Sequence, residues 1–281
     1  MYREAAGLAS SAIALRNRYP AVMTTTERPA PFRKLSRFQL LRRRLMHGTL
    51  RRLGVRSYVL NTQGARFRID TEDYVDRVVV VFGMWDEVQL GRLARLASAH
   101  RFDVLLDIGA NTGFYSVMFA MKNLCPRIIA FEPDPGNYAR LMTNLRLNNL
   151  TERVEVMPLA LGDREGEVRL YEGGSHNRGE STIAVPEQTP QDKSHQVRVA
   201  RLDDLYAFSG QRLMLKIDVE GYEFEVLSGM AQTLRNNGCY VQIEHYGSRH
   251  DDLKAVFADF GYRFLDSFDI DLYFTNIPGI E

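Results

Sequence analysis

The chain has 281 residues, of which 45% are hydrophobic and 25% are charged, and its net charge is +1. This composition is typical of a globular protein with a sizeable core and excludes a disordered or low-complexity chain. No apolar run approaches the length of a membrane span, and we expect no signal peptide. The two cysteines, Cys125 and Cys239, lie far apart beside apolar runs, which favours buried thiols, no disulfide and a reducing cytoplasm.

The N-terminal part of the chain is basic and the remainder is acidic. Residues 28–56 contain ten Lys and Arg and no Asp or Glu; residues 1–56 carry +11 and residues 57–281 carry −10. Apolar residues at helical spacing predict a basic amphipathic helix, or a pair of helices, within 32–53. These residues are Phe32, Leu35, Phe38, Leu41 and Leu45. We therefore divide the chain into a basic helical arm, residues 1–56, and a main domain, residues 57–281.

Three partners suit this arm. An anionic membrane surface is the first, and it would make a cytoplasmic protein peripheral to the inner face of a membrane. Nucleic acid is the second, although the acidic main domain disfavours it. The third is a protein surface, either the chain's own acidic domain or a second copy in a homo-oligomer, with the arginines left in solvent.

Residues 56–99 predict three further elements. A hairpin joins 58–60 to 66–69, the apolar run 78–82 is a helix or a strand, and a helix covers 88–99 with Asp86 as its N-cap. Trp85 is the only tryptophan. It either closes one side of a ligand pocket or belongs to the core.

From Val104 onwards strands and helices alternate, which predicts an α/β domain. The expected strands are 104–108, 127–131, 154–157, 213–217 and 240–243, and the expected helices are 114–123, 136–147, 223–236 and 250–259. A closing antiparallel hairpin joins 261–264 to 272–274. Residues 166–201 interrupt the alternation with short strands, 167–171 and 196–199, around a polar loop, 173–182, that suits a polyhydroxyl acceptor.

The first strand of this series carries the most informative turn. A buried strand with one acid, Asp107, opens into Gly109-Ala-Asn-Thr-Gly113 and then a helix. The spacing G-x-x-x-G differs from the dinucleotide pattern G-x-G-x-x-G, and Asp107 would repel a pyrophosphate while favouring a cationic ligand. Glu132 ends the second strand, where a carboxylate accepts hydrogen bonds from a ribose diol, which NAD and S-adenosylmethionine (SAM) both possess.

Four blocks together resemble the FkbM family of SAM-dependent methyltransferases, over roughly residues 75–275. They are Asp107 to Ser116, Phe131 to Pro135, Ala160 to Asp163, and Leu215 to Glu223 with Val226 to Gly229. The resemblance implies an α/β fold with a doubly wound, seven-stranded Rossmann-like sheet, mostly parallel with an antiparallel last strand, here preceded by the basic helical extension. It implies SAM as cofactor and O-methylation of a sugar hydroxyl in a glycan, glycolipid or glycosylated metabolite.

The resemblance also implies roles for the strand ends. Those assigned to the cofactor are Asp107 for the ammonium, Gly109, Ala110, Asn111 and Gly113 for the methionine moiety, Glu132 for the ribose, and Pro133, Ala160, Leu161 and Asp163 for the adenine side. The turn residues have structural alternatives as well: Asn111 suits the backbone of a tight turn, and Asp163 suits a Gly-Asp turn.

A hydroxyl acceptor also needs a base, and the candidates are Asp218, Glu220 and His245. Asp218 ends the strand beside the cofactor strand, whereas His245 has a suitable ordinary pKa but lies one strand further out. A divalent cation held by Asp218 and Glu244 is a minority alternative. Two other functions stay open: a nucleic-acid methyltransferase that uses the arginine-rich arm, and a non-catalytic binding module with the SAM fold.

Overall fold

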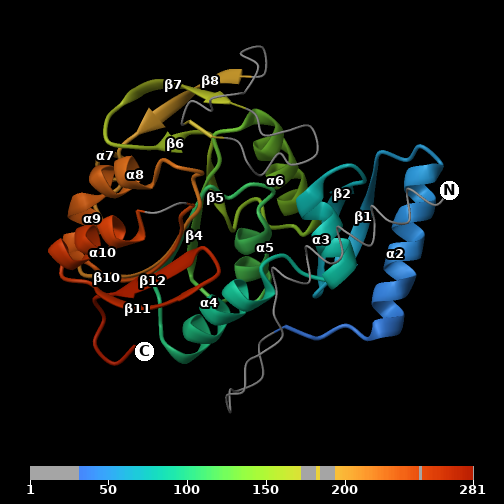
Figure 1. Cartoon of the computed structure of the whole chain (residues 1–281), viewed down its shortest axis with the longest axis horizontal. Coiled ribbons are helices and arrows are strands. Elements are labelled where there is room, and N and C mark those ends of the chain that lie inside the picture. Colours follow the sequence, from blue (N-terminus) through green and yellow to red (C-terminus); the bar gives the residue numbers. More distant parts are fainter. Residues whose placement is uncertain (1–31, 172–181, 184–193, 247–248, 281) are drawn as a thin grey trace. The chain divides into compact units, whose positions relative to one another are not determined.

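The structure, a computed structural model, describes residues 32–171, 182–183, 194–246 and 249–280, all within the compact unit Pro31–Glu281. Seven strands form its central sheet in the order β11-β12-β10-β9-β3-β4-β5 (Figure 1). Their bounds are β3 Val104–Ile108, β4 Arg127–Phe131, β5 Glu155–Met157, β9 Arg212–Ile217, β10 Gly238–Glu244, β11 Arg263–Phe268 and β12 Asp271–Thr275. Every expected strand of the α/β series is therefore present.

The pairing of these strands confirms the predicted sheet. Strands β5, β4, β3, β9 and β10 pair in parallel, and β12 is antiparallel to both of its neighbours, β10 and β11. The strand order reverses direction between β3 and β9, because the chain first builds outward to β4 and β5 and then returns to the other side. Ligands of open α/β sheets bind at such a switch point, outside the carboxyl ends of the strands.

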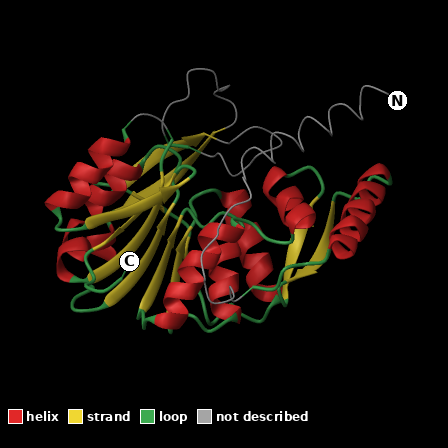
Figure 2. Cartoon of the chain, turned by 60° about the horizontal axis from the view of Figure 1, so that its bottom comes forward, coloured by secondary structure: helices red, strands yellow, loops and turns green. Residues whose placement is uncertain are grey.

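Helices cover both faces of the sheet (Figure 2). Helices α4 Glu87–Ala99, α5 Phe114–Met121 and α6 Pro135–Leu147 share one hydrophobic cluster, and α7 Leu202–Leu205, α8 Glu223–Gly229, α9 Ala231–Asn236 and α10 His250–Asp259 share another. Leu105 points to the first cluster and Leu106 to the second, so the strands are buried on both faces, as their continuous apolar runs indicate. The single helix expected over 223–236 is wrong, because the chain breaks it at Met230.

A smaller sheet follows β5 in the chain. Strands β6 Ala160–Leu161, β7 Gly166–Tyr171 and β8 Ser194–Ala200 form it in the order β6-β8-β7. Strands β7 and β8 confirm the two short strands expected on either side of the polar loop. The loop itself, 173–182, lies outside the described residues apart from Thr182.

The N-terminal elements of the unit are α2 Arg37–Arg52, the hairpin strands β1 Ser57–Thr62 and β2 Ala65–Asp70, and α3 Tyr74–Phe82. The basic helix and the hairpin are confirmed, and the undecided run 78–82 is helical. Phe67 on β2 stacks on Phe114 of α5 with ring centroids 4.7 Å apart. The hairpin is thus packed on the α/β part, while the proposed domain boundary after residue 56 stays a prediction.

A buried ion-pair cluster joins α3 to α6. The Arg140 guanidinium donates to Asp73 Oδ2 over 3.2 Å and to Asp76 Oδ2, and all three side chains are buried. Burial raises the pKa of Asp76 to about 7, against the opposing effect of the Arg140 charge. Asp73 is also the N-cap of α3, so the same cluster fixes where that helix begins.

The described residues also bear on two expectations, one about the cysteines and one about membrane-spanning helices. Cys125 and Cys239 are buried free thiols, as expected, and burial raises the pKa of each to about 12. Among the helices that the structure describes, none is long and apolar enough to cross a membrane.

Candidate functional site

A row of polar side chains crosses the sheet near its carboxyl edge. Asp107 of β3 is paired in register with Lys216 of β9, and Lys216 is paired with Gln242 of β10. Side chains in register on adjacent strands point to the same face. All three lie buried on the face covered by α4 and α5, where the strands are otherwise apolar.

The glycine turn after β3 brings two strand ends into contact. Gly109 and Gly113 have φ values of +78° and +80°, which favour glycine, and Asn111 lies in the same region at +52°. A Cβ atom at Gly109 would stand 1.7 Å from the backbone oxygen of Asp218. The glycine is therefore required both for its φ and for the close approach of the β9 end.

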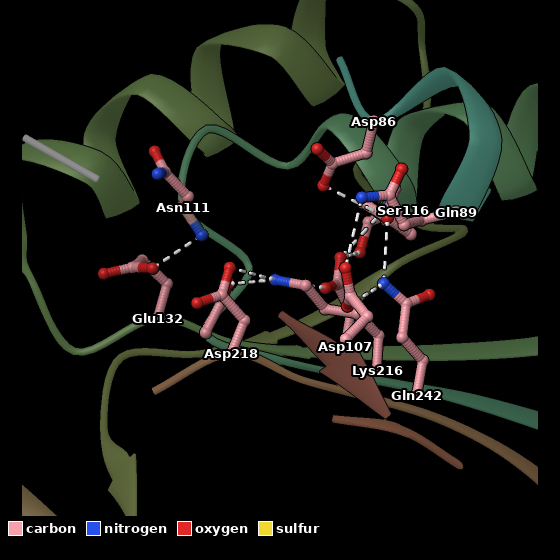
Figure 3. A network of polar contacts seen from close by, with 12 residues as sticks. Asp86, Gln89, Asp107, Asn111, Ser116, Glu132, Lys216, Asp218 and Gln242 are labelled. Atoms are coloured by element: carbon pink, nitrogen blue, oxygen red, sulfur yellow. Dashed lines mark hydrogen bonds and ion pairs between the residues drawn. The ribbon is translucent and has the colours of Figure 1, made fainter. Parts of the chain in front are cut away.

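Lys216 joins this turn to the end of its own strand (Figure 3). Its Nζ donates to the Gly109 carbonyl oxygen over 2.8 Å and to Asp218 Oδ2 over 3.0 Å. Burial alone would lower the pKa of Lys216, but the neighbouring Asp218 and Asp107 carboxylates outweigh it and raise the pKa above its ordinary value. The lysine is a cation built into the site, and it fixes where the Asp218 carboxylate lies.

Asp107 serves the turn from inside the protein. Its Oδ2 accepts from the Ser116 amide over 3.1 Å and from the Ser116 hydroxyl over 2.6 Å, at the start of α5. Its Oδ1 lies 4.0 Å from Lys216 Nζ, so the nearest cation is the chain's own lysine. Asp107 is fully buried and does not line the cavity described below, and its predicted contact with a ligand ammonium stays a prediction.

Glu132 holds the glycine turn from the end of β4. Its Oε2 accepts from the Asn111 amide over 2.6 Å, and its Oε1 accepts from the Asp134 amide over 2.8 Å. Burial raises its pKa to about 8 even though both amides oppose the shift. Each carboxylate oxygen has two lone-pair directions, so both oxygens retain the capacity to accept a further donor.

A cavity opens at the switch point between β3 and β9. Its lining combines polar groups of the turn with a broad apolar wall: Ile108, Gly109, Asn111, Phe131, Glu132, Pro133, Asn137, Leu159, Ala160, Leu161, Leu170, Ile183, Asp218, Val219, Glu220 and Tyr222. Eight sequence-predicted residues thus meet here, namely Gly109, Asn111, Glu132, Pro133, Ala160, Leu161, Asp218 and Glu220. Ala110, Gly113, Asp163 and His245 are not part of the lining.

A second polar group lies beyond the sheet, where α4 begins. Tyr115 Oη donates to Asp86 Oδ2 over 3.2 Å, and Gln242 Nε2 lies 3.3 Å from the same Tyr115 oxygen. Gln242 and Gln89 each donate to Asp271, over 2.7 and 3.1 Å. Asp86 was expected to cap α4, but its φ of +46° is outside the extended region that a capping residue needs, and it makes no cap bond.

Three buried carboxyl groups near Lys216 have raised pKa values. Burial, with Asp271 as the next cause, raises the pKa of Asp86 to about 8, and burial raises that of Asp271 to about 6. Burial together with the nearby Asp218 charge raises the pKa of Glu244 to about 10. The site therefore gathers more acid than its one lysine neutralises.

His245 is turned to a different partner. Its Nδ1 lies 2.9 Å from Glu223 Oε2, and the other oxygen of Glu223 accepts from the Gly221 amide over 2.7 Å. The imidazole is buried, and the structure does not bring it to the cavity that Asp218 lines. Its role as a base stays a prediction.

The other acidic residues named in the sequence analysis lie partly together and partly apart. Carboxylate oxygens of Asp218, Glu220 and Glu244 lie within 4.8 Å of one another, which is the grouping that the metal alternative needs and leaves that alternative a prediction. Asp163 lies outside the cavity lining, and its Oδ2 is 3.7 Å from Arg164 Nη1.

Sequence reasoning did not identify Tyr222 or Asp86 as site residues. Tyr222 lines the cavity and its ring is close to Gly162, where an added Cβ would stand 2.9 Å from the ring. The sequence signal for Tyr222 is its position directly after Val219-Glu220-Gly221, the segment that follows β9. For Asp86 no local signal exists, because its position before a helix has an ordinary explanation as a cap.

Strand order, glycine turn and the acid at the end of β4 define a Rossmann-like fold of the class I methyltransferase type. The family model described as the Methyltransferase FkbM domain matches residues 107–264. The chain belongs to the FkbM family and is a methyltransferase.

Individual relatives are distant. The hexuronic acid methyltransferase AglP of Haloferax volcanii is 25% identical over 205 residues, which cover 69% of this chain and 76% of AglP. The 2-O-methyltransferase NoeI of Sinorhizobium fredii is 26% identical over 145 residues, or 47% of this chain and 58% of NoeI. A crystal structure of an FkbM methyltransferase from Methylobacillus flagellatus shares 21% identity with a TM-score of 0.45, covering 62% of this chain and 43% of that one.

Proposed function

We propose that this methyltransferase uses SAM and transfers the methyl group to a hydroxyl of a sugar in a glycan, glycolipid or glycosylated metabolite. The observation that supports this most strongly is the cavity at the β3/β9 switch point, where the Glu132 carboxylate, the glycine turn and Asp218 meet. The relatives that act on a hexuronic acid, or as a 2-O-methyltransferase, favour a sugar hydroxyl as the acceptor.

The residues of the cavity fit SAM. The wall made by Phe131, Leu159 and Leu161 is apolar and suits a purine base. Glu132 keeps lone pairs for the ribose hydroxyls, since each oxygen holds one amide. Gly109 and Asn111 leave the backbone of the turn accessible at the cavity.

When bound, SAM supplies an activated methyl group on a sulfonium. The protein then has to align the acceptor oxygen with that methyl, and alignment can lower a barrier by up to roughly 7–11 kcal/mol. Asp218 is the group that we assign to the acceptor proton, because it lines the cavity and is held by Lys216 at 3.0 Å. Lys216 holds that carboxylate in one place, since its own bond to the Gly109 oxygen fixes the ammonium.

The test separates cofactor binding from transfer. Glu132→Gln is expected to weaken SAM binding, measured by calorimetry, by roughly 10–100-fold, because the amide NH₂ that replaces one carboxyl oxygen can accept neither a backbone amide nor a further hydrogen bond. Asp218→Asn is expected to bind SAM normally but to lower transfer by about 10²–10⁴-fold, the usual contribution of a positioned base. Transfer is measured as labelled methyl incorporated into glycans containing hexuronic acid.

Two surface variants are the controls. Glu152→Gln and Asp251→Asn make the same chemical changes at exposed positions and are expected to leave binding and transfer unchanged. A wild-type chain that fails to bind SAM at millimolar concentration contradicts the proposal. Methylation of RNA in place of glycans would contradict the acceptor but not the cofactor.

A further inference from the structure

Polar side chains of helix α2 hold it to the rest of the unit. His47 is buried, and its Nδ1 lies 3.1 Å from the Tyr58 hydroxyl on β1. Arg43 is partly buried and donates to the Asn61 carbonyl oxygen over 2.6 Å at the end of the same strand. A helix on the surface of a globular unit normally turns its apolar stripe to the core. In α2 the inward face contains a histidine and an arginine between the partly buried Leu40 and Leu50.

The apolar stripe of α2 faces the opposite way. Phe38, Leu41 and Leu45 are 74%, 54% and 64% exposed, and their i, i+3, i+7 spacing places them on one side of the helix. Phe38 and His47 are nine positions apart, about two and a half turns, and so lie on opposite sides. We call these three residues the α2 stripe. Removing these three side chains from water would be energetically favourable, so we look for a partner that covers the stripe.

Positive charge surrounds the α2 stripe. Arg37, Arg42 and Arg52 are exposed, and residues 28–56 contain no acid at all. On the helix, Arg37 and Arg42 lie on either side of the stripe, and Arg52 lies at its C-terminal end. Long arginine side chains beside an apolar stripe can bury their stems while the guanidinium stays at a wet, anionic boundary.

We propose that helix α2 docks on anionic phospholipid bilayers, with the α2 stripe in the acyl boundary and the exposed arginines at the lipid phosphates. An interfacial helix with an apolar stripe between basic flanks fits this surface. With 16 residues, six of them arginines, α2 would lie on a membrane and not cross it. The proposal does not rest on SAM or on a sugar acceptor.

A second copy of the chain is the less suitable occupant. A two-fold contact between α2 stripes would bring the arginines of both helices together, with no acid in either segment 28–56 to neutralise them. Nucleic acid is also less suitable, because phosphate contacts do not require three exposed apolar side chains in the middle of the basic surface.

Vesicle sedimentation of the full chain tests the proposal. Binding is expected to vesicles containing phosphatidylglycerol, to be much weaker to pure phosphatidylcholine, and to fall with added salt. The combined change Phe38→Ser, Leu41→Ser and Leu45→Ser is expected to lower the partition coefficient at least about a hundredfold. Arg37→Gln, Arg42→Gln and Arg52→Gln together are expected to lower it by on the order of 10–100-fold.

A charge-matched variant separates the α2 surface from net charge. Arg101→Gln, Arg146→Gln and Arg169→Gln remove the same charge from exposed positions elsewhere and are expected to bind vesicles like wild type. The melting temperature of every variant is measured first. It is expected to equal that of the wild type, since the altered side chains are exposed. Equal sedimentation of the wild type and the serine variant overturns the proposal. So does a lipid-free dimer that the serine variant converts to monomer, which would assign the α2 stripe to a second copy.

Discussion

Among single residues, Gly109 is constrained both by its φ and by the strand end that lies against it. Gly109 and Gly54 have nearly the same φ, +78° and +76°, but only Gly109 faces another strand. A Cβ there would meet the Asp218 carbonyl oxygen at 1.7 Å, whereas nothing lies within 4 Å of one at Gly54. Comparing substitutions at the two glycines therefore distinguishes the cost of a left-handed backbone from the cost of a steric clash.

Gly109→Ala is expected to destabilise the protein by more than about 4 kcal/mol, because two strand ends must move apart. Gly54→Ala is expected to cost only about 1–2 kcal/mol, the penalty of the left-handed region. Urea denaturation of the two variants measures both values. Equal losses of stability would mean that the contact at Asp218 contributes little.

Residue roles were the least predictable part of the site. The spacing of the glycine turn and the positions of Glu132 and Asp218 could be read from the sequence, because each directly follows an apolar strand. The partners could not: Lys216 meets Gly109 across 107 positions and Asp86 meets Tyr115 across 29, and no local pattern encodes such contacts. His245 follows a strand as well, but position alone does not fix where a side chain points beyond a strand end.

At the scale of elements, the buried cluster of Arg140 with Asp73 and Asp76 attaches α3 to the α/β part of the chain. Arg140→Ala is expected to destabilise the protein by about 3–5 kcal/mol, because it leaves two buried carboxylates without their cation. Arg146→Ala, on the exposed side of the same helix, is expected to change stability by less than about 0.5 kcal/mol.

Chemical denaturation at pH 7 measures this pair. A loss below about 1 kcal/mol in the Arg140 variant would show that the attachment of α3 does not depend on the cluster. Most elements here could be predicted from periodicity, because strands of the sheet are apolar runs and helices carry a 3.6-residue pattern. Helix α2 shows the limit of that approach: its pattern located the helix correctly but could not reveal that the apolar side is exposed.

At the scale of the whole molecule, buried acids make stability depend on pH. The pKa values of Asp86, Glu132 and Asp271 are raised to about 8, 8 and 6, so the folded chain holds protons that the unfolded chain has released. Their stabilising contribution is full below pH of about 4 and is lost as the pH rises through these raised values. The melting temperature is therefore expected to be lower at pH 9 than at pH 6.

Asp86→Asn tests the origin of this dependence. Asp86 is surrounded by Asp271, Asp218, Lys216 and Tyr115, and the amide cannot ionise among them. The difference in melting temperature between pH 6 and pH 9 is expected to shrink by roughly 2–4 °C for each 1 kcal/mol removed. Asp251→Asn, at an exposed position, keeps the wild-type difference. An unchanged difference in the Asp86 variant would locate the dependence elsewhere.

The two bonds of Lys216 have a consequence for how such a protein can evolve. Since one ammonium holds both the Gly109 carbonyl oxygen and the Asp218 carboxylate, a substitution that shifts either group disturbs the other. The turn and the end of β9 thus depend on each other for their positions. The start of α4 at Asp86 lies outside the segment 107–264 that the family model matches, and substitutions there are expected to leave both bonds of Lys216 in place.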